Sequence, residues 1–427
     1  MRKIDIFREN GRINIDNAVN FGIVKKGSPN LEGAREKFWC ESKDGEFLYK
    51  KIVQSSYEDY AEIIASEIAN MIELPCAEYD FAISNDQYGV ISFDFVGEDE
   101  ELISGKEILE QVNQIHILPI RDVCSKYKEF INIIQVDNSI SKKEILIKLI
   151  ELYNDSILGS KFLDTYLNSI NLDNLTEQQI EFLIVTINDY FKELSILYEY
   201  DFEDWNRKRQ VYVSNNLMDI WSLLDNYCKI NGFHMTENAP IMLDLVKLFL
   251  YDIILNQGDR HISNWGVIRN VLTNEIRLAP IYDNSKICKL YEEQNVIKQK
   301  ATSINSFNNK QMNEKKREAT RDAINNQLNG KLSSKLMVDF DDNDQRNNRV
   351  EMLKKLFKIS SEEVSDFARY ILSKLKSDNI IELFENIEKK YCIEIPNEVK
   401  VVTLKVVELN LEQINIILGT EEKSYGV

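Results

Sequence analysis

Four polar residues in two short segments are of the types that transfer a phosphoryl group. Asp259, His261 and Asn264 lie in NQGDRHISNWG, and Asp283 lies in the later PIYDN. Phosphoryl transfer needs a carboxylate near the attacking hydroxyl and hard oxygen ligands for the magnesium ion that neutralises the phosphates. Asp259 would orient or deprotonate the hydroxyl, while Asn264 and Asp283 would bind Mg²⁺. His261 would brace the loop or contact the phosphoryl group.

Each segment also has a plain structural interpretation. Asp-Arg-His is compatible with a polar turn that contains an ion pair, and Asp283-Asn284 is compatible with a β-turn. The first segment, however, directly follows an apolar stretch from Ile241 to Leu255, which predicts a buried helix with the polar loop at its carboxyl end. The two segments together therefore favour the chemical interpretation.

A small β-rich region precedes these segments. Four runs between about Phe38 and Val96 predict strands: KFWC, FLYKKIV, YDFAI and YGVISFDF. Between the second and third runs, residues 56–72 carry apolar side chains at helical spacing, which predicts an amphipathic helix with one buried face. Pro75 discourages its continuation. After the first polar segment, GVIRN and IRLAPIY predict a β-hairpin with its turn at Leu272 to Asn274.

Most of the remaining chain has helical periodicity. Residues 104–232 and the part after residue 350 contain long segments with apolar residues at the 3.6-residue period. Residues 286–321 are polar and locally basic, and they predict a long loop. The sequence thus predicts an α+β chain with a nucleotide-binding lobe at 1–100 and a helical catalytic lobe at 101–427, whose catalytic and metal loops lie at 256–285.

Charge and composition restrict the classes of partner and location. The chain has 427 residues, a net charge of −18 and a pI near 4.9, so its surface is expected to repel nucleic acid. Its six cysteines are scattered, which argues against a disulfide framework or a zinc site. No signal peptide and no apolar run long enough to span a membrane occur in the sequence. A cytoplasmic location is expected, or secretion as an effector without a classical signal peptide.

The two polar segments resemble the catalytic and metal loops of the HipA-like serine/threonine kinases. That family has an Asp-x-His, an Asn shortly after it and a later Asp. The phosphoinositide kinases have a similar Gly-Asp-Arg-His-x-x-Asn, but typically an Asp-Phe-Gly at the second position, whereas Tyr282-Asp283-Asn284 is closer to the HipA-like pattern. The resemblance implies a bilobal protein-kinase-like fold that uses ATP and Mg²⁺, with a small β-rich lobe containing one helix and a large, mainly helical lobe.

The resemblance extends to the first lobe. The family's glycine-containing phosphate loop is similar to Gly33-Ala34-Arg35-Glu36-Lys37, whose backbone N–H groups and basic side chains, Arg35 or Lys37, would hold the phosphates. The strand from Gly89 to Val96 falls where the lobes should join. Its backbone would bind adenine, with Phe93 or Phe95 covering the ring; both rings are equally compatible with the core.

A kinase also needs a lysine for the α- and β-phosphates and a helical carboxylate that holds this lysine. By resemblance we expect Lys50 and Glu62 in these roles. Lys51 is the alternative to Lys50, and Glu58 is the alternative to Glu62. A plain structural interpretation is that these four residues are solvated surface charges with no role in binding phosphate.

Two departures from the family are visible. Full-length HipA toxins have a further domain before the glycine loop, where this chain has about 32 residues, so a compact member is expected. The serine that many members phosphorylate before that loop corresponds to Asn30, with Ser28 nearby.

Three functions fit these residues. The first is a protein Ser/Thr kinase, by resemblance a toxin component or effector with an antitoxin or regulatory partner. Its segment 286–321 would bind an acidic substrate, accept phosphate at Thr302, Ser303 or Ser306, or be a solvated loop. The second is a small-molecule or lipid kinase, although the acidic charge opposes anionic membranes. The third is a nucleotide-binding pseudokinase.

Overall fold

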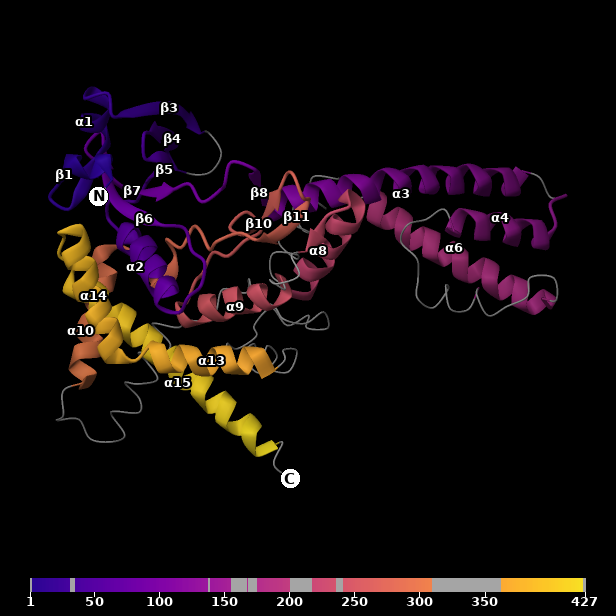
Figure 1. The fold of residues 1–427 in the computed structure, drawn as a ribbon. Coiled ribbons are helices and arrows are strands. Elements are labelled where there is room, and N and C mark those ends of the chain that lie inside the picture. The colour runs from indigo at the N-terminus through magenta and orange to yellow at the C-terminus, as the bar shows by residue number, and fades with distance from the viewer. Residues whose placement is uncertain are drawn as a thin grey trace. The chain divides into compact units, whose positions relative to one another are not determined.

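A computed structural model of the chain describes residues 2–30, 35–136, 139–154, 167, 175–199, 217–235, 241–308 and 362–424. The fold divides into two compact units (Figure 1). One unit comprises residues 1–105 and 213–427, and the other comprises residues 106–212. The sequence predicted a boundary after residue 100 between two lobes. That boundary is not the one between these two units, and it stays a prediction.

A seven-stranded sheet carries the amino-terminal part of the first unit, in the order β1-β2-β6-β7-β5-β4-β3. Its strands are β1 (Arg8–Glu9), β2 (Arg12–Asn14), β3 (Val24–Asn30), β4 (Lys37–Ser42), β5 (Gly45–Lys51), β6 (Tyr79–Ser84) and β7 (Gln87–Phe93). The four strands predicted from the sequence are β4 to β7. The sequence did not predict β1 to β3, the 3-10 helix η1 (Lys3–Phe7) or helix α1 (Ile15–Asn20), which begins at the N-cap Asn14.

Helix α2 (Glu58–Met71) is the predicted helix of this lobe, and its end at Ile72 agrees with the prediction. The expectation of one buried face was wrong, because eleven of its residues are buried. Helix α2 packs against strands β6 and β7 of the sheet, and helix α14 (Ser377–Tyr391) also packs against α2. Glu58, Asp59 and Glu62 are among the buried residues, so their charges need partners inside the protein.

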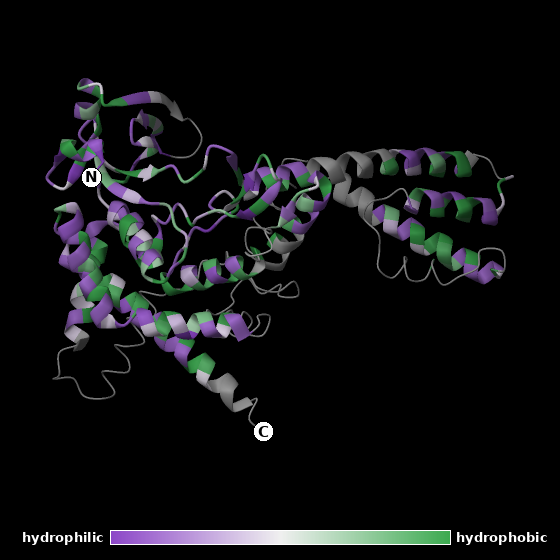
Figure 2. Ribbon diagram, viewed as in Figure 1, coloured by the Kyte–Doolittle hydropathy of each residue, from purple (hydrophilic) through white to green (hydrophobic). Residues whose placement is uncertain are grey.

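A four-stranded sheet and helix α9 form the part of the first unit that carries the two polar segments. The sheet has the order β8-β10-β11-β9, with β8 (Glu100–Ser104), β9 (His234–Met235), β10 (Gly266–Asn270) and β11 (Glu275–Leu278). The predicted hairpin is β10–β11, in which Val267 pairs with Leu278. The predicted buried helix is α9 (Ile241–Ile254), which is largely hydrophobic in Figure 2. It ends directly before the first polar segment.

The other helices of this unit are α8 (Leu217–Asn231), the 3-10 helix η3 (Ile287–Lys289), α10 (Gln294–Asn308), α13 (Glu362–Lys374), α14 and α15 (Asn397–Ser424). Helix α10 corrects the predicted loop at 286–321. Ile297, Ala301 and Ile304 form a buried stripe at helical spacing, and α10 packs along α15. Thr302, Ser303 and Ser306 donate to the backbone carbonyls four residues earlier, within this helix. Residues 309–321 lie outside the described residues.

The second unit is helical, as predicted. It contains α3 (Gly105–Val136), α4 (Lys142–Asn154) and α6 (Glu177–Glu199), and α4 packs against α6. Its core contains Leu149, Leu183 and Ile187, and the stacked rings of Tyr127 and Phe191 lie 4.5 Å apart. Within the ranges described for the two units, no helix is both long and apolar enough to cross a membrane.

Gly89 offers a test of the packing around β5. A Cβ at Gly89 would lie 2.6 Å from the Lys50 carbonyl oxygen and 2.7 Å from the Tyr49 ring. We expect Gly89→Ala to lower the free energy of unfolding by about 1–3 kcal/mol, because the backbone of β5 must shift. The control is Gly419→Ala in α15, where a Cβ would contact nothing within 4 Å. That change should be neutral or stabilising by up to about 1 kcal/mol in urea titrations. Equal effects would contradict the close approach of β5 to β7.

Candidate active site

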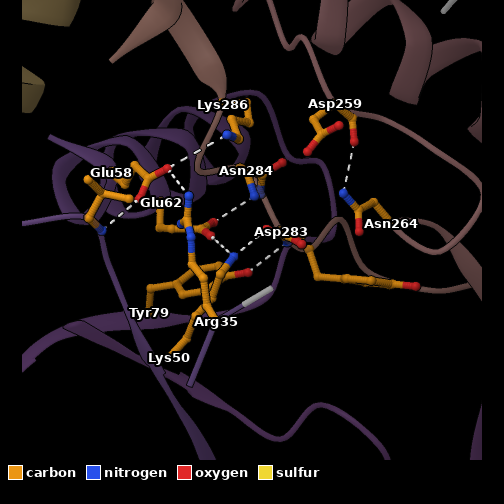
Figure 3. A network of polar contacts seen from close by, with 12 residues as sticks. Arg35, Lys50, Glu58, Glu62, Tyr79, Asp259, Asn264, Asp283, Asn284 and Lys286 are labelled. Carbon is orange, nitrogen blue, oxygen red and sulfur yellow. Dashed lines mark hydrogen bonds and ion pairs between the residues drawn. The ribbon is translucent and has the colours of Figure 1, made fainter. Parts of the chain in front are cut away.

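The loop after α9 folds into a compact turn. The backbone N–H of His261 donates to the carbonyl of Asp259 at 2.8 Å, and that of Asn264 donates to the carbonyl of His261 at 2.8 Å. Asn264 Nδ2 also donates to the Asp259 carbonyl at 2.8 Å, so its Oδ1 is the side-chain atom suited to a metal. His261 Nδ1 accepts from the N–H of Ser263 at 3.2 Å, a bond that braces the loop. Asp259 and Asn264 therefore lie together (Figure 3).

Arg260 is a buried residue that ties this loop to its surroundings. Its Nε and Nη2 donate to both oxygens of Asp252 in α9, each at 2.9 Å. Nη1 donates to the carbonyls of Asn264 at 2.8 Å and Tyr282 at 2.6 Å. Nη2 also donates to Asn284 Oδ1 at 2.7 Å. All five guanidinium N–H groups are thus used. They join α9 to the predicted catalytic loop (residues 256–266) and to the predicted metal motif (residues 280–284).

Arg260 and Asp252 are each other's charge partners, although for Asp252 burial outweighs Arg260 and raises the pKa of the carboxyl. Burial alone opposes the charge of Arg260, but Asp252 outweighs this effect and raises the pKa of the guanidinium. No role was predicted for Arg260 from the sequence. A signal was present, because Asp252 interrupts an apolar helix, and a buried carboxylate requires a cationic partner.

The metal motif has a left-handed backbone at Asp283, with φ of 56°. This conformation is uncommon for residues other than glycine and needs support from neighbouring groups. The N–H of Asp283 donates to the Tyr79 hydroxyl at 2.9 Å, and the N–H of Asn284 donates to Glu62 Oε2 at 2.6 Å. Gln257 Nε2 donates to the Asp283 carbonyl at 3.2 Å. The motif is thus bonded to β6, to α2 and to the residues before the catalytic loop.

Lys50, Glu62 and Asp283 meet at one point (Figure 3). Lys50 Nζ lies 3.1 Å from Glu62 Oε1 and forms a second ion pair with Asp283 Oδ1. Burial disfavours the charge of Lys50, but the two carboxylates outweigh it and raise its pKa. Burial likewise opposes ionisation of Asp283, and Lys50 outweighs it and lowers that pKa. For Glu62 burial prevails and raises the pKa. One cation therefore serves two carboxylates.

The alternatives Lys51 and Glu58 have other partners. Lys51 Nζ lies 4.0 Å from Glu36 Oε2 near the surface. Glu58 forms an ion pair with Arg35, accepts from the N–H of Val53 at 3.1 Å and lies 3.9 Å from Lys286 Nζ. The geometry therefore favours Lys50 and Glu62 as the pair expected from the sequence, and it assigns Glu58 to the anchoring of Arg35.

Of the predicted phosphate loop, Gly33 and Ala34 lie outside the described residues. Arg35 lies just before β4, and Lys37, the first residue of β4, pairs across the sheet with Lys50. Directly opposed residues of neighbouring strands point to the same face of a sheet. Lys37 and Lys50 thus share one face of the sheet, while Arg35 is held on Glu58 of α2. Lys286, which follows the metal motif, was not predicted and also approaches Glu58.

The two aromatic candidates for adenine differ in their surroundings. The ring of Phe93 packs against Phe47, at 6.1 Å between centroids, and the Arg2 guanidinium lies 3.6 Å from its centroid. Phe93 is partly buried and packs against the core of the small lobe, so its role at adenine stays a prediction. Phe95 stacks on Tyr282, next to Asp283, at 6.0 Å and 23°. Phe95 is the better-placed candidate.

These features define an α+β, bilobal protein-kinase-like fold, as predicted. The structure is similar to that of the proinflammatory kinase CtkA from Helicobacter pylori, with a TM-score of 0.50, 13% identity, and coverage of 94% of this chain and 97% of that one. It also matches a chain of the HipA–HipB toxin–antitoxin complex with operator DNA from Shewanella oneidensis MR-1, with a TM-score of 0.30, 10% identity, and coverage of 93% and 64%. The predicted likeness to HipA-like kinases is thus confirmed as a likeness of fold. No protein-family model matches the sequence, and no curated protein matches it significantly.

The buried pair of Arg260 and Asp252 leads to a stability prediction. We expect Asp252→Ala to lower the free energy of unfolding by about 3–5 kcal/mol, because it leaves a buried guanidinium without its counter-charge. The matched control is Asp225→Ala in α8, which removes the exposed partner of Lys229 and should cost less than about 1 kcal/mol. Chemical denaturation of both variants measures the difference. A loss of less than 1 kcal/mol in Asp252→Ala would contradict the role of Arg260 as the anchor of the loop.

Proposed function

We propose that the chain is an ATP-dependent kinase that transfers the γ-phosphate to a hydroxyl, most directly a Ser or Thr of a protein. The observation that carries the proposal is the convergence of Lys50, Glu62 and Asp283, which come from β5, α2 and the segment after β11. A lysine held by a helical carboxylate beside a metal-motif aspartate is the arrangement that phosphoryl transfer requires. The kinase-like fold supports the same conclusion.

The cations around Lys50 would hold the phosphates of ATP. Lys50 has two carboxylate partners and Arg35 has Glu58, so their side chains are preorganised on one side of α2. Lys37 lies on the same sheet face as Lys50. Gly33 and Ala34 complete the proposed phosphate loop. Phe95, which stacks beside Asp283, would cover one face of the adenine.

Asn264 and Asp283 would hold Mg²⁺, and their donor atoms fit this ion. Both provide hard oxygen atoms, and Mg²⁺ commonly takes only one or two protein carboxylates together with substrate phosphates. Glu62 and Asp283 share a single lysine, so the cluster carries excess negative charge. The bound ion would neutralise the phosphates during transfer.

Asp259 would accept or orient the proton of the attacking hydroxyl. It lies on the same short turn as Asn264, whose side chain bonds to the Asp259 carbonyl, so the proposed base and metal ligand keep a fixed relation. His261 braces this turn through its Nδ1. The remaining proposals follow from the resemblance: a cytoplasmic or effector role, and an antitoxin or regulatory partner. The phosphoryl-transfer experiment distinguishes this protein kinase from a small-molecule or lipid kinase and from a pseudokinase.

The proposal is tested by incubating the protein with Mg²⁺, γ-labelled ATP and an acceptor protein. Asp259→Asn should reduce transfer by about 10²–10⁴-fold, because it removes the base without changing the loop's size. Asp283→Asn should also lose transfer, and excess Mg²⁺ should restore part of it. Asp225→Asn, on the surface of α8, serves as the control and should match the wild type. Bound ATP without label transfer or ATP consumption would indicate a pseudokinase, and consumption without labelled protein would indicate a small acceptor.

Lys50 and Lys51 provide an internal comparison within one strand. Lys50→Met should reduce kcat/KM for ATP by roughly ten- to a hundredfold, the order of one lost bond between charged groups. Lys51→Met removes only an exposed partner of Glu36 and should retain nearly full activity. Steady-state kinetics over a range of ATP concentrations measure both. A stronger effect at Lys51 than at Lys50 would contradict the assignment.

A further inference from the structure

Tyr79 is a buried tyrosine at the start of β6 whose hydroxyl contacts the metal motif. Its side chain is 4% exposed, and its hydroxyl oxygen accepts the N–H of Asp283 at 2.9 Å (Figure 3). Tyr79 comes from the small lobe, and Asp283 lies 204 positions later in the chain. The contact therefore joins the sheet to the aspartate proposed as a metal ligand. No sequence motif predicted this contact.

The hydroxyl of Tyr79 is suited to accept this bond as a neutral group. Burial, and then the charges of Glu62 and Cys76, raise the pKa of Tyr79 well above its ordinary value. A neutral hydroxyl can accept an N–H without adding a further negative charge beside Asp283 and Glu62. A carboxylate at the same place would repel both.

The backbone of the metal motif is bonded to the small lobe at several successive residues. Ile281 exchanges two backbone bonds with the segment before β6: its N–H donates to Pro75, and its carbonyl accepts from Ala77, each at 2.8 Å. Asp283 then donates to Tyr79, and Asn284 donates to Glu62. The turn of direction falls at Asp283, where φ is 56°.

Among the bonds from the small lobe, the Tyr79 bond is thus the one made by the Asp283 backbone itself, whose carbonyl also accepts from Gln257 Nε2. The bonds of Ile281 fix the approach of the segment, and the bond of Asn284 fixes its exit. Without the hydroxyl, the Asp283 N–H would lose this partly buried acceptor, and the left-handed backbone would keep only the Gln257 bond to its carbonyl. The direction of the Asp283 side chain depends on that backbone.

We infer that Tyr79 is a positioning residue that holds the backbone of Asp283 so that its carboxylate faces both Lys50 and a divalent cation. The consequence for transfer rests on the proposed function, whereas the effect on the Asp283 backbone does not. Tyr79 touches neither of the reacting groups in this assignment. Its loss should therefore weaken the response to the metal more than the affinity for ATP.

The backbone of Tyr79 is itself held by a hydrogen bond from helix α14. The hydroxyl of Tyr391, the last residue of α14, lies 3.1 Å from the Tyr79 carbonyl and 3.1 Å from Glu67 Oε1. The Tyr391 ring also packs edge-on against Phe81, two residues along β6. The carboxyl-terminal helices thus support the start of β6, and through it the metal motif. The predicted effect of Tyr79 is local because this backbone support is retained when only the hydroxyl is removed.

The test compares Tyr79→Phe with Tyr49→Phe in the whole chain. Tyr49 is a buried tyrosine of the same sheet, but its hydroxyl donates to the Gln87 carbonyl at 2.8 Å, away from Asp283. Three quantities are measured in each protein: hydrogen exchange of the Asp283 amide, Mn²⁺ affinity by its paramagnetic signal in the presence of a non-hydrolysable ATP analogue, and transfer as a function of Mg²⁺ and of ATP. The first two do not require transfer.

We expect Tyr79→Phe alone to speed exchange at Asp283 and to raise the Mn²⁺ dissociation constant and the half-saturating Mg²⁺ concentration about tenfold, the order of one buried hydrogen bond. The KM for ATP and the unfolding midpoint of Tyr79→Phe should then resemble those of Tyr49→Phe. Equal exchange and equal metal affinity in the two variants would overturn the inference. If Tyr79→Phe failed to fold, the wild type would still decide, because exchange at Asp283 as fast as at an exposed amide would exclude the bond.

These readouts separate the inference from the proposed function. A wild type that transfers no phosphate, together with faster exchange and weaker Mn²⁺ binding in Tyr79→Phe, would support the positioning role and contradict the kinase. A wild type that transfers phosphate, with Tyr79→Phe indistinguishable from Tyr49→Phe, would contradict the positioning role and leave the kinase intact.

Discussion

The geometry of the candidate site depends on one buried guanidinium, that of Arg260, which needs partners for its charge and its five N–H groups. Arg260 is 2% exposed, and such a charge is tolerated inside a protein only when a counter-charge and hydrogen-bond acceptors surround it. Asp252 supplies the counter-charge from α9, and three acceptors come from Asn264, Tyr282 and Asn284. These acceptors belong to the two polar segments. Satisfying one arginine therefore brings the catalytic loop and the metal motif together.

The small lobe is joined to this assembly through the metal motif. The amides of Asp283 and Asn284 donate to Tyr79 and Glu62, and the Asp283 carboxylate pairs with Lys50. Every one of these three partners belongs to the seven-stranded sheet or to α2, whereas Arg260 belongs to the other lobe. Asp283 is thus held from both sides, which explains how a left-handed aspartate is maintained at this position. Burial of α2 beneath α14 supplies the rigid surface that carries Glu62.

The parts that the sequence predicted are those that local patterns determine. Strands β4 to β7, helices α2 and α9 and the β10–β11 hairpin follow from short-range periodicity and turn residues. The strands β1 and β2 contain two and three residues, which is too few for a periodic signal. They form because β2 pairs with β6 and β1 pairs with β2. The prediction of a loop at α10 was wrong. Its short apolar stripe of Ile297, Ala301 and Ile304 is buried because α10 packs on α15, a contact that the local sequence does not show.

The same distinction applies to the site. Residue types and spacing suggested Asp259, Asn264 and Asp283, because chemistry restricts which side chains can act. The spacing could not show which of two adjacent lysines turns inward, since that depends on the phase of β5 relative to α2. It also could not show Tyr79, because a hydroxyl that accepts one amide from a residue 204 positions away leaves no pattern in the sequence.

The arrangement around Lys50 also couples the state of the lysine to that of the aspartate. Lys50 forms ion pairs with Asp283 and Glu62 at once, and Asp283 is the carboxylate proposed as a metal ligand. If Lys50 turned toward the phosphates of a nucleotide, Asp283 would lose its ion-pair partner, and a divalent cation would replace the lost positive charge. Glu62 would stay in place, because its second oxygen accepts the Asn284 amide. The single lysine between two carboxylates therefore fits the proposed function, in which a nucleotide and a cation would bind together.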